Sequence, residues 1–179
     1  MQKRIKIFFV IYILFVLKVI IFKYPFAQLY AIVQTWQKGV VLEGLGTANF
    51  VPFKTIKMYI DYAYKLNSFE NLAGNILVFV PFGILFPMVR AKRNCFFDVF
   101  LNVFVLVLGI EVFQLFSAFG AFDVDDIILN CFGAILGYII YRKCEDIFLW
   151  QQGKRITEEK KKHLIILYIG FYITNPIRK

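Results

Sequence analysis

The sequence predicts an all-α polytopic membrane protein, built as a bundle of four transmembrane helices. Of the 179 residues, 60% are hydrophobic, and the mean hydropathy is +0.67; soluble domains contain about 45–50% apolar residues. Four apolar runs approach or reach the roughly 20 residues that a helix needs to cross the hydrocarbon core. Basic residues flank these runs and form no continuous stripe, so the net charge of +9 indicates membrane topology and anionic lipid, not nucleic acid.

The predicted spans cover residues 5–22, 72–89, 96–116 and 126–141. The first has the basic start of a signal peptide. Its apolar run is longer than a signal peptide's, however, and no A-x-A cleavage site follows, so we expect an uncleaved span. The second span contains Pro81 and Pro87. The fourth is the shortest, and we expect it to extend back through Asp125.

The distribution of Lys and Arg predicts that both termini are cytoplasmic. Basic residues precede the first span and follow the second and the fourth. The connection between the third and fourth spans has no Lys or Arg, and its only charged residues are Asp123, Asp125 and Asp126. Residues 23–70 would then be an outer loop. The preference of basic residues for the cytoplasmic side weakens in loops of this length, so the lysines of the loop do not contradict the assignment. We therefore predict a transmembrane domain over residues 1–141 and a basic cytoplasmic tail over residues 142–179, with anionic lipid at its face.

The outer loop has two stretches with helical spacing of apolar residues. The first is Phe26, Leu29, Tyr30, Val33, Trp36 and Val40, and the second is Ile56, Tyr59, Ile60, Ala63 and Leu66 opposite Lys54, Lys57, Asp61 and Lys65. Such helices either lie in the membrane interface or pack over the bundle, and both arrangements make the loop a lid. In the tail, residues 164–174 are apolar but too short to span. A re-entrant or interfacial segment is expected there, with a fifth, tilted span as the alternative.

Polar side chains gather at the outer ends of the second, third and fourth spans. They are Asn71, Asn75, Glu111, Gln114, Asp123, Asp125, Asp126 and Asn130. Several of them are three or four residues apart and share a helix face. An ionisable group in lipid costs about 2.5–3.5 kcal/mol and by default marks a functional site. Residues from three helices meeting at one depth therefore predict a ligand-binding site.

The residue types limit what this site can do. The single histidine, His163, lies in the predicted tail, which excludes a Ser/His/Asp relay and a histidine-rich zinc site. The oxygens of Glu111, Asp123 and Asp126 would suit a hard divalent cation, although no cofactor is required. Glu111 is also a candidate general acid or base if its pKa is raised. Acidic residues would repel a bare phosphate.

Structural roles compete with this interpretation. Interhelical amides hold helices together, and Asp123 or Asp126 would cap the fourth span. Gly133 and Gly137 form a GxxxG pattern, which permits close helix packing. Asp98, near the inner edge, is expected to pair with neighbouring basic residues.

Three segments also resemble motifs of the VanZ-like family. They are Asn49-Phe-Val-Pro52-Phe53-Lys54-Thr-Ile56, then Asn71-Leu-Ala-Gly-Asn75-Ile-Leu-Val-Phe-Val-Pro81-Phe-Gly83, and finally Glu111-Val-Phe-Gln114 followed by Phe122-Asp123-Val-Asp125-Asp126-Ile-Ile-Leu-Asn130-Cys-Phe-Gly133-Ala-Ile-Leu-Gly137-Tyr138. The match runs from about residue 10 to residue 141. It departs from the family pattern at Gly120 and Ala121, where many relatives have an arginine. The resemblance implies a bacterial plasma-membrane protein, and some members are associated with reduced susceptibility to teicoplanin-type lipoglycopeptide antibiotics.

Three functions remain open on this evidence. A binding protein would hold a lipid-linked envelope component, such as a cell-wall precursor, or a lipoglycopeptide antibiotic in a polar cleft at the outer leaflet. A membrane enzyme would act on a phospholipid or polyprenyl headgroup, with Glu111 as the candidate catalytic residue. A scaffold would organise other envelope proteins through the charged tail. The convergence of polar residues at one depth favours the binding protein.

Overall fold

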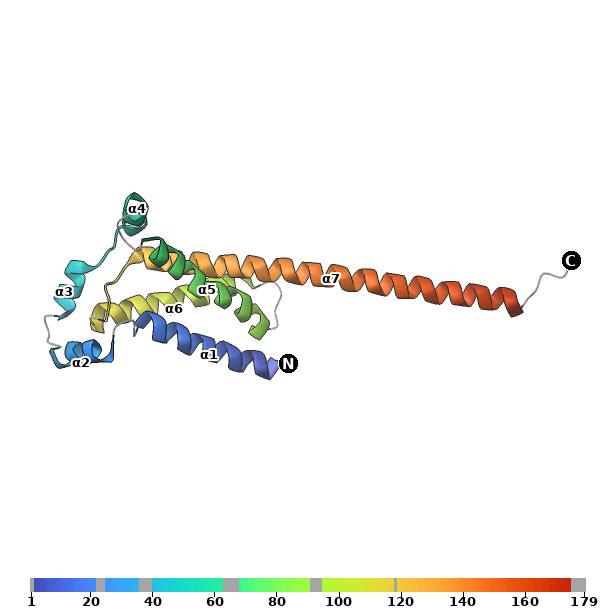
Figure 1. The fold of residues 1–179 in the computed structure, drawn as a ribbon, viewed down its shortest axis with the longest axis horizontal. Coiled ribbons are helices and arrows are strands. Elements are labelled where there is room, and N and C mark those ends of the chain that lie inside the picture. The colour runs from blue at the N-terminus through green and yellow to red at the C-terminus, as the bar shows by residue number, and fades with distance from the viewer. Residues whose placement is uncertain are drawn as a thin grey trace. The chain divides into compact units, whose positions relative to one another are not determined.

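The computed structural model describes residues 2–21, 25–35, 40–62, 68–90, 95–117 and 119–174. Within these ranges the chain forms α1 (Gln2–Ile21), α2 (Phe26–Thr35), α3 (Val40–Thr47), α4 (Lys54–Asp61), α5 (Ser68–Arg90), α6 (Phe96–Ser117) and α7 (Val124–Thr174) (Figure 1). The described ranges contain no strand, only an isolated parallel bridge between Asn49 and Asp123. The predicted all-α membrane bundle is confirmed.

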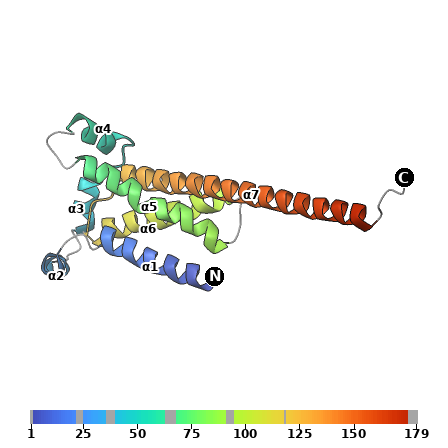
Figure 2. The same ribbon diagram turned by 45° about the vertical axis from the view of Figure 1, so that its right-hand side comes forward.

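The chain divides into two compact units, Met1–Tyr141 and Arg142–Lys179. In the first unit, α1 and α6 end where α5 and α7 begin, and α2, α3 and α4 lie around that same end (Figures 1 and 2). We call it the polar end. This up-and-down arrangement brings together segments that are far apart in the sequence, and it places the ends of four helices beside the loop that joins α1 to α5.

The number of helices that could cross a membrane differs from the prediction. Within the described residues, Phe69–Arg90, Phe96–Ser117 and Val124–Ile166 are long and apolar enough, so the predicted count of four spans is one too high by this criterion. α1 carries Lys3, Arg4, Lys6 and Lys18, and each such charge is costly in hydrocarbon unless its side chain reaches the interface. α1 nevertheless packs against α5 and α6, with Val16 fully buried.

α7 is much longer than the predicted fourth span over residues 126–141. It continues to Thr174, so residues 164–174 form the end of this helix and not a separate segment. The physical reason lies in the composition of residues 142–166, which hold no proline and only one glycine, Gly153. Glu, Lys, Arg and Gln are good helix formers, and without a breaker the helix started in the bundle propagates through them.

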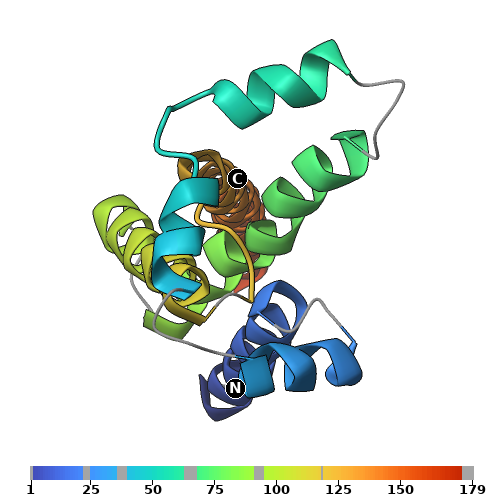
Figure 3. The same cartoon turned by 90° about the vertical axis from the view of Figure 1, so that its left-hand side faces the viewer.

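The loop between α1 and α5 contains three short helices. α2 and α4 lie within the two predicted helical stretches, but α4 ends at Asp61, before the end of the second stretch. Val40, the last residue of the first stretch, instead begins α3, which the apolar spacing did not predict as a separate helix. Seen from the polar end (Figure 3), α3 packs on α6 and α4 packs on α5. Part of the predicted spacing lies outside the described residues, namely Trp36, Lys38, Ala63, Lys65 and Leu66.

α6 shows how the bundle separates its core from lipid. Its buried side chains follow a helical stripe: Val99, Val103, Val107, Ile110, Glu111 and Gln114. On the opposite face, Phe97 is 81% exposed and Leu101 is 60% exposed. A helix that is apolar all round but buries only one stripe is suited to face lipid with the rest. Glu111 and Gln114 occupy the polar end of the buried stripe, which turns both side chains into the bundle.

Close contact between α5 and α7 depends on three glycines. A methyl group on Gly133 would lie 2.0 Å from the carbonyl oxygen of Ile76, and one on Gly137 would lie 2.0 Å from that of Val80. On α5, a methyl group on Gly83 would lie 1.9 Å from the carbonyl oxygen of Ala134. The helix backbones therefore touch, as the GxxxG pattern predicts.

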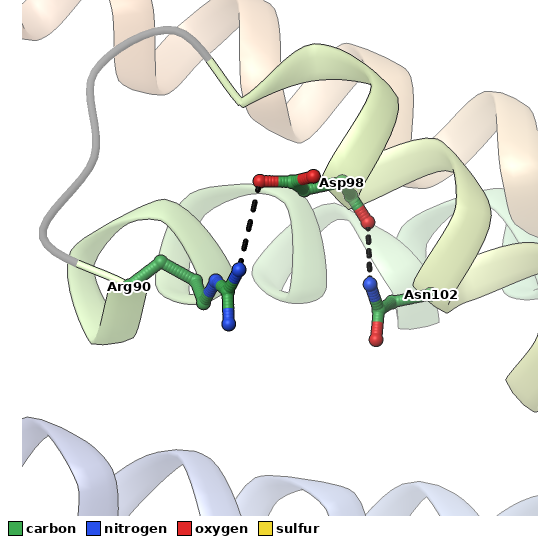
Figure 4. Close-up of polar contacts among 3 residues, drawn as sticks. All are labelled: Arg90, Asp98 and Asn102. Carbon is green, nitrogen blue, oxygen red and sulfur yellow. Dashed lines mark hydrogen bonds and ion pairs between the residues drawn. The ribbon is translucent and has the colours of Figure 1, made fainter.

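At the other end of the first unit, the predicted pairing of Asp98 is confirmed. Arg90 Nη2 lies 3.8 Å from Asp98 Oδ2, and Asn102 Nδ2 donates to the Asp98 backbone carbonyl at 2.8 Å (Figure 4). The Arg90 side chain is 56% exposed, so water and salt screen the pair and its contribution is at most about 1 kcal/mol. Lys92 and Arg93 lie outside the described residues.

Candidate ligand-binding cleft

The polar end gathers the predicted site residues, and it divides them into two groups. Asp123 and Asp125 accept hydrogen bonds that fasten the α3–α4 connection and α4 to the bundle, and Glu111 accepts one from the connection between α6 and α7. Asn71, Asn75, Gln114 and Asp126 line a cleft. Asn130 belongs to neither group.

Asp123 caps α7 and ties it to the loop. Its Oδ1 accepts the N–H of Asp125 at 2.8 Å, which satisfies a backbone donor in the first turn of α7. The same carboxylate accepts Asn49 Nδ2 at 2.8 Å and the Thr55 hydroxyl at 2.6 Å. Two backbone hydrogen bonds of 2.8 and 3.0 Å close the parallel bridge between Asn49 and Asp123. The predicted capping role of Asp123 is therefore confirmed.

Asp125 caps a different helix, α4, from across the chain. Phe53, at the start of α4, has no side-chain cap and a left-handed φ of 66°. Asp125 is fully buried, and its carboxylate accepts the N–H groups of Phe53, Thr55 (2.7 Å) and Ile56 (3.1 Å). An anion at a helix start is favoured by both these donors and the helix dipole. Asp125 thus supplies the cap that the local sequence of α4 lacks.

Glu111 supports this arrangement from α6. It is 1% exposed, and its Oε2 accepts the backbone N–H of Asp123 at 2.9 Å. All three predicted cation ligands, Glu111, Asp123 and Asp126, therefore accept hydrogen bonds from the protein. Across the described residues, no group of three or more His, Cys, Asp or Glu side chains is arranged to hold a metal ion.

The cleft lies between α1, α4, α5, α6 and α7 and has a volume of about 240 Å³. Its polar lining consists of Tyr59, Glu70, Asn71, Asn75, Gln114 and Asp126. Val19 and Ile20 of α1 and Val78 of α5 form an apolar wall. Tyr59 and Glu70 are absent from the predicted site. Tyr59 is recognisable only as part of the apolar face of the predicted loop helix, and Glu70 only as the neighbour of Asn71.

Hydrogen bonds orient two of the lining side chains. Asn75 Nδ2 donates to Asp126 Oδ1 at 2.5 Å, joining α5 to α7. Gln114 is 3% exposed, and its Nε2 donates to the Ile20 carbonyl at 3.3 Å, joining α6 to α1. The cleft is therefore built on four helices that hold one another in place, and α4 adds Tyr59 from the loop.

The electrostatic character of the cleft is acidic. None of the residues that line it in the described structure is basic, whereas Glu70 and Asp126 both line it. Burial raises the pKa of the Tyr59 hydroxyl, and the charges of Asp126 and Asp123 raise it further. The Tyr59 hydroxyl therefore keeps its proton to a higher pH than an ordinary tyrosine does.

Two glycines define the space around these side chains. A methyl group on Gly74, which lines the cleft, would meet no heavy atom within 4 Å. A methyl group on Gly120 would lie 2.8 Å from the amide carbon of Gln114. Gly120 therefore lets the Gln114 amide lie directly against the backbone, at a position where the resemblance leads one to expect an arginine.

Asn130 lies one helix turn beyond Asp126 on α7 and is 2% exposed. Among the described residues, its Oδ1 has no hydrogen-bond partner. It is not part of the cleft lining. The spacing in the sequence correctly places Asn130 on the same face of α7 as Asp126. It does not reveal that the α5 backbone packs directly against Gly133, one turn further along this face.

The fold and the site define a polytopic α-helical membrane protein with a polar cleft at one end of its bundle. A sequence model of the VanZ/LLP1 family matches residues 9–149, and the chain belongs to this family. Protein VanZ of Enterococcus faecium is 30% identical over 106 residues, which make up 59% of this chain. The chain covers 60% of that relative's length. No solved structure matches the chain.

Proposed function

We propose that the cleft binds the headgroup of a lipid-linked envelope component or of a lipoglycopeptide antibiotic at the outer leaflet. Binding there would lower susceptibility to teicoplanin-type antibiotics. The observation that carries the proposal is the cleft itself, where amides and carboxylates from four helices surround one cavity. Its 240 Å³ is below the roughly 300–1,000 Å³ of sites for drug-sized molecules, so it would take a headgroup and not a whole lipid or antibiotic.

The surroundings of the cleft support a ligand with an apolar part. Next to the start of α4, Phe50, Val51 and Phe53 are 56%, 59% and 62% exposed, and Ile60 on α4 is 63% exposed. Exposed apolar residues gathered at the end of a membrane bundle are suited to acyl chains in the interface. α4 also contributes Tyr59 to the lining. It would therefore act as the lid, contacting the headgroup on one side and acyl chains on the other.

The proposal places the protein in the bacterial plasma membrane with the polar end outside and both termini in the cytoplasm. The exposed basic residues of the second unit would then face anionic lipid at the cytoplasmic surface. Cys144 tests this orientation because it is exposed, whereas Cys95 and Cys131 are buried. We expect a membrane-impermeant maleimide to label the protein in intact spheroplasts only after permeabilisation, with Cys144→Ser removing the label. Labelling of Cys144 before permeabilisation would invert the orientation and refute an outer-leaflet cleft.

Filling the cleft tests its role in resistance. Gly74→Leu adds a large side chain to the lining of the cleft, at a position where its Cβ would meet no heavy atom within 4 Å. Gly109→Leu makes the same change at a position on α6 where the Cβ also meets no heavy atom within 4 Å. We expect Gly74→Leu to return teicoplanin susceptibility of expressing cells to that of cells without the protein, because the headgroup loses its space. Gly109→Leu should keep wild-type resistance. Equal resistance of both variants at equal membrane levels would refute the proposal.

A further inference from the structure

We infer that α4 and the turn before it dock on the surface of the bilayer itself and prefer anionic phospholipid. The exposed apolar side chains of residues 50–62, which we call the docking segment, would lie among the acyl chains, and the ammonium groups of Lys54 and Lys57 would contact the lipid phosphates. This inference goes beyond the proposed function, because it concerns bulk lipid and holds whether or not the cleft has a ligand. It requires only that the polar end lies at a membrane surface.

The first observation is the amount of apolar surface that the docking segment exposes. Phe50, Val51, Phe53, Ile60 and Tyr62 are all more than half exposed. Exposed apolar side chains gathered in this way mark an interaction site, because water disfavours them. At the end of a membrane bundle, the apolar partner within reach is the acyl-chain region of the bilayer. Lipid is therefore the occupant that these side chains fit.

The orientation of α4 is that of an interfacial helix. It runs across the axis of the bundle at the polar end and packs beside α5 (Figures 1 and 3). A helix that lies across membrane-spanning helices is parallel to the membrane plane. Ile56 and Tyr59 are partly buried, whereas Ile60 beside them is 63% exposed. The apolar side of α4 thus extends beyond its contact with the bundle and over the neighbouring lipid.

The backbone of Phe53 is a second, independent observation. Its φ of 66° lies in the left-handed region, which a bulky side chain rarely adopts and a glycine adopts freely. Packing within the protein repays little of this strain, because the side chain is 62% exposed. Strained backbone of this kind gathers at functional contacts. An aromatic ring held outward under strain fits insertion into the membrane interface.

The charges of α4 favour anionic lipid. Lys54 and Lys57 are three residues apart and share the face of the helix opposite Tyr59. Both are exposed, and no described carboxylate lies within ion-pair distance of either ammonium group. The buried Asp125 accepts backbone N–H groups, and Asp61 is the only carboxylate on α4 itself. The flexible lysine stems can therefore bring both cations to lipid phosphates, where a negative surface adds to the attraction.

Fluorescence quenching tests whether the segment docks. The full chain carrying Cys144→Ser receives a fluorophore at Ile60→Cys or at Asp61→Cys and is placed in phospholipid nanodiscs; the remaining Cys95 and Cys131 are buried. We expect spin-labelled lipid to quench the label at position 60 at least threefold more than the label at position 61, and aqueous iodide to give the reverse order. Val51→Cys, outside the helix, should behave like Ile60→Cys. Equal quenching of all three labels by iodide would overturn the inference.

The lipid composition tests the role of the lysines. Replacing part of the phosphatidylcholine by phosphatidylglycerol should raise lipid quenching at Ile60→Cys at least twofold, and Lys54→Gln/Lys57→Gln should abolish this rise. Lys160→Gln/Lys162→Gln removes the same charge from exposed positions of the second unit and should preserve it. Absence of a rise in the parent chain, or the same rise in both double variants, would refute the preference for anionic lipid.

Phe53→Gly separates insertion of the ring from support of the helix. Glycine adopts the left-handed φ freely, so the amides of Thr55 and Ile56 should exchange no faster than before. Lipid quenching at Ile60→Cys should nevertheless fall at least twofold, because the ring no longer inserts. Unchanged quenching, or faster exchange at these amides, would overturn the insertion of Phe53. None of these readouts depends on resistance. Loss of resistance in Gly74→Leu without lipid docking would refute only this inference, and docking without an effect of Gly74→Leu on resistance would refute only the proposed function.

Discussion

Gly133→Ala should destabilise the bundle by about 3 kcal/mol, near the upper end of the usual cost of overpacking. The added methyl group would lie 2.0 Å from the Ile76 carbonyl oxygen, and backbone atoms cannot turn aside as a side chain can. α5 and α7 would have to separate by about 1 Å, which opens a close-packed interface. The loss would be measured as the change in unfolding free energy in a denaturant titration of the purified protein.

The matched control is the same substitution at Gly109 on α6. There the methyl group meets nothing within 4 Å. Alanine is a better helix former than glycine by up to about 1 kcal/mol, so Gly109→Ala should leave stability unchanged or raise it. Opposite signs for one chemical change would locate the effect in the α5–α7 contact. Equal, small effects at both positions would show that the two helices are not in backbone contact.

This glycine contact also affects the cleft. Ile76, which faces Gly133, directly follows Asn75, whose side chain donates to Asp126 across the same two helices. Separation of α5 from α7 would lengthen that hydrogen bond and move two lining residues apart. Gly133→Ala protein that still folds should therefore show weakened ligand binding, with no substitution inside the cleft itself.

Much of the fold follows from patterns that depend on one helix at a time. Apolar runs predict α5 and α6, and helical spacing predicts α2 and α4. α7 continues to Thr174 because the charged segment that follows the bundle contains no helix breaker over residues 142–166. The periodicity of apolar residues does not predict this, since the segment has few apolar residues. α1 shows the opposite difficulty. Its length suits a span, but its basic residues weigh against one, and packing on α5 and α6 holds it in the bundle.

The sequence predicts where the polar residues gather but not which of them line the cleft. Helix ends and face sharing place the eight polar residues at one end of the bundle, because each of these relations is local. Which of them line the cleft depends on the loop. Asn49 and Thr55 donate hydrogen bonds to Asp123, and three backbone N–H groups donate to Asp125, so these two carboxylates hold the loop and do not line the cleft. Such partners are about 70 residues away in the sequence, as in the hydrogen bond from Thr55 to Asp125. No spacing rule reveals them.

The second large effect is expected from Asp125→Asn. Its carboxylate is fully buried and accepts three backbone N–H groups at the start of α4. Hydrogen bonds to a charged group contribute about 1.5–3 kcal/mol each, and the asparagine would present an amide N–H₂ to at least one backbone donor. We expect a loss of about 3 kcal/mol, expressed mainly as release of α4 and not as unfolding of the bundle.

Hydrogen exchange locates this effect. In Asp125→Asn, the amides of Thr55 and Ile56 should exchange at least tenfold faster, because their acceptor is weakened and the left-handed Phe53 loses the contact that holds it. Asp61→Asn removes the same charge from an exposed position on α4 and should change neither amide. Since α4 brings Tyr59 to the cleft, its release should also weaken binding there. Unchanged exchange at both amides would mean that Asp125 does not fasten the lid.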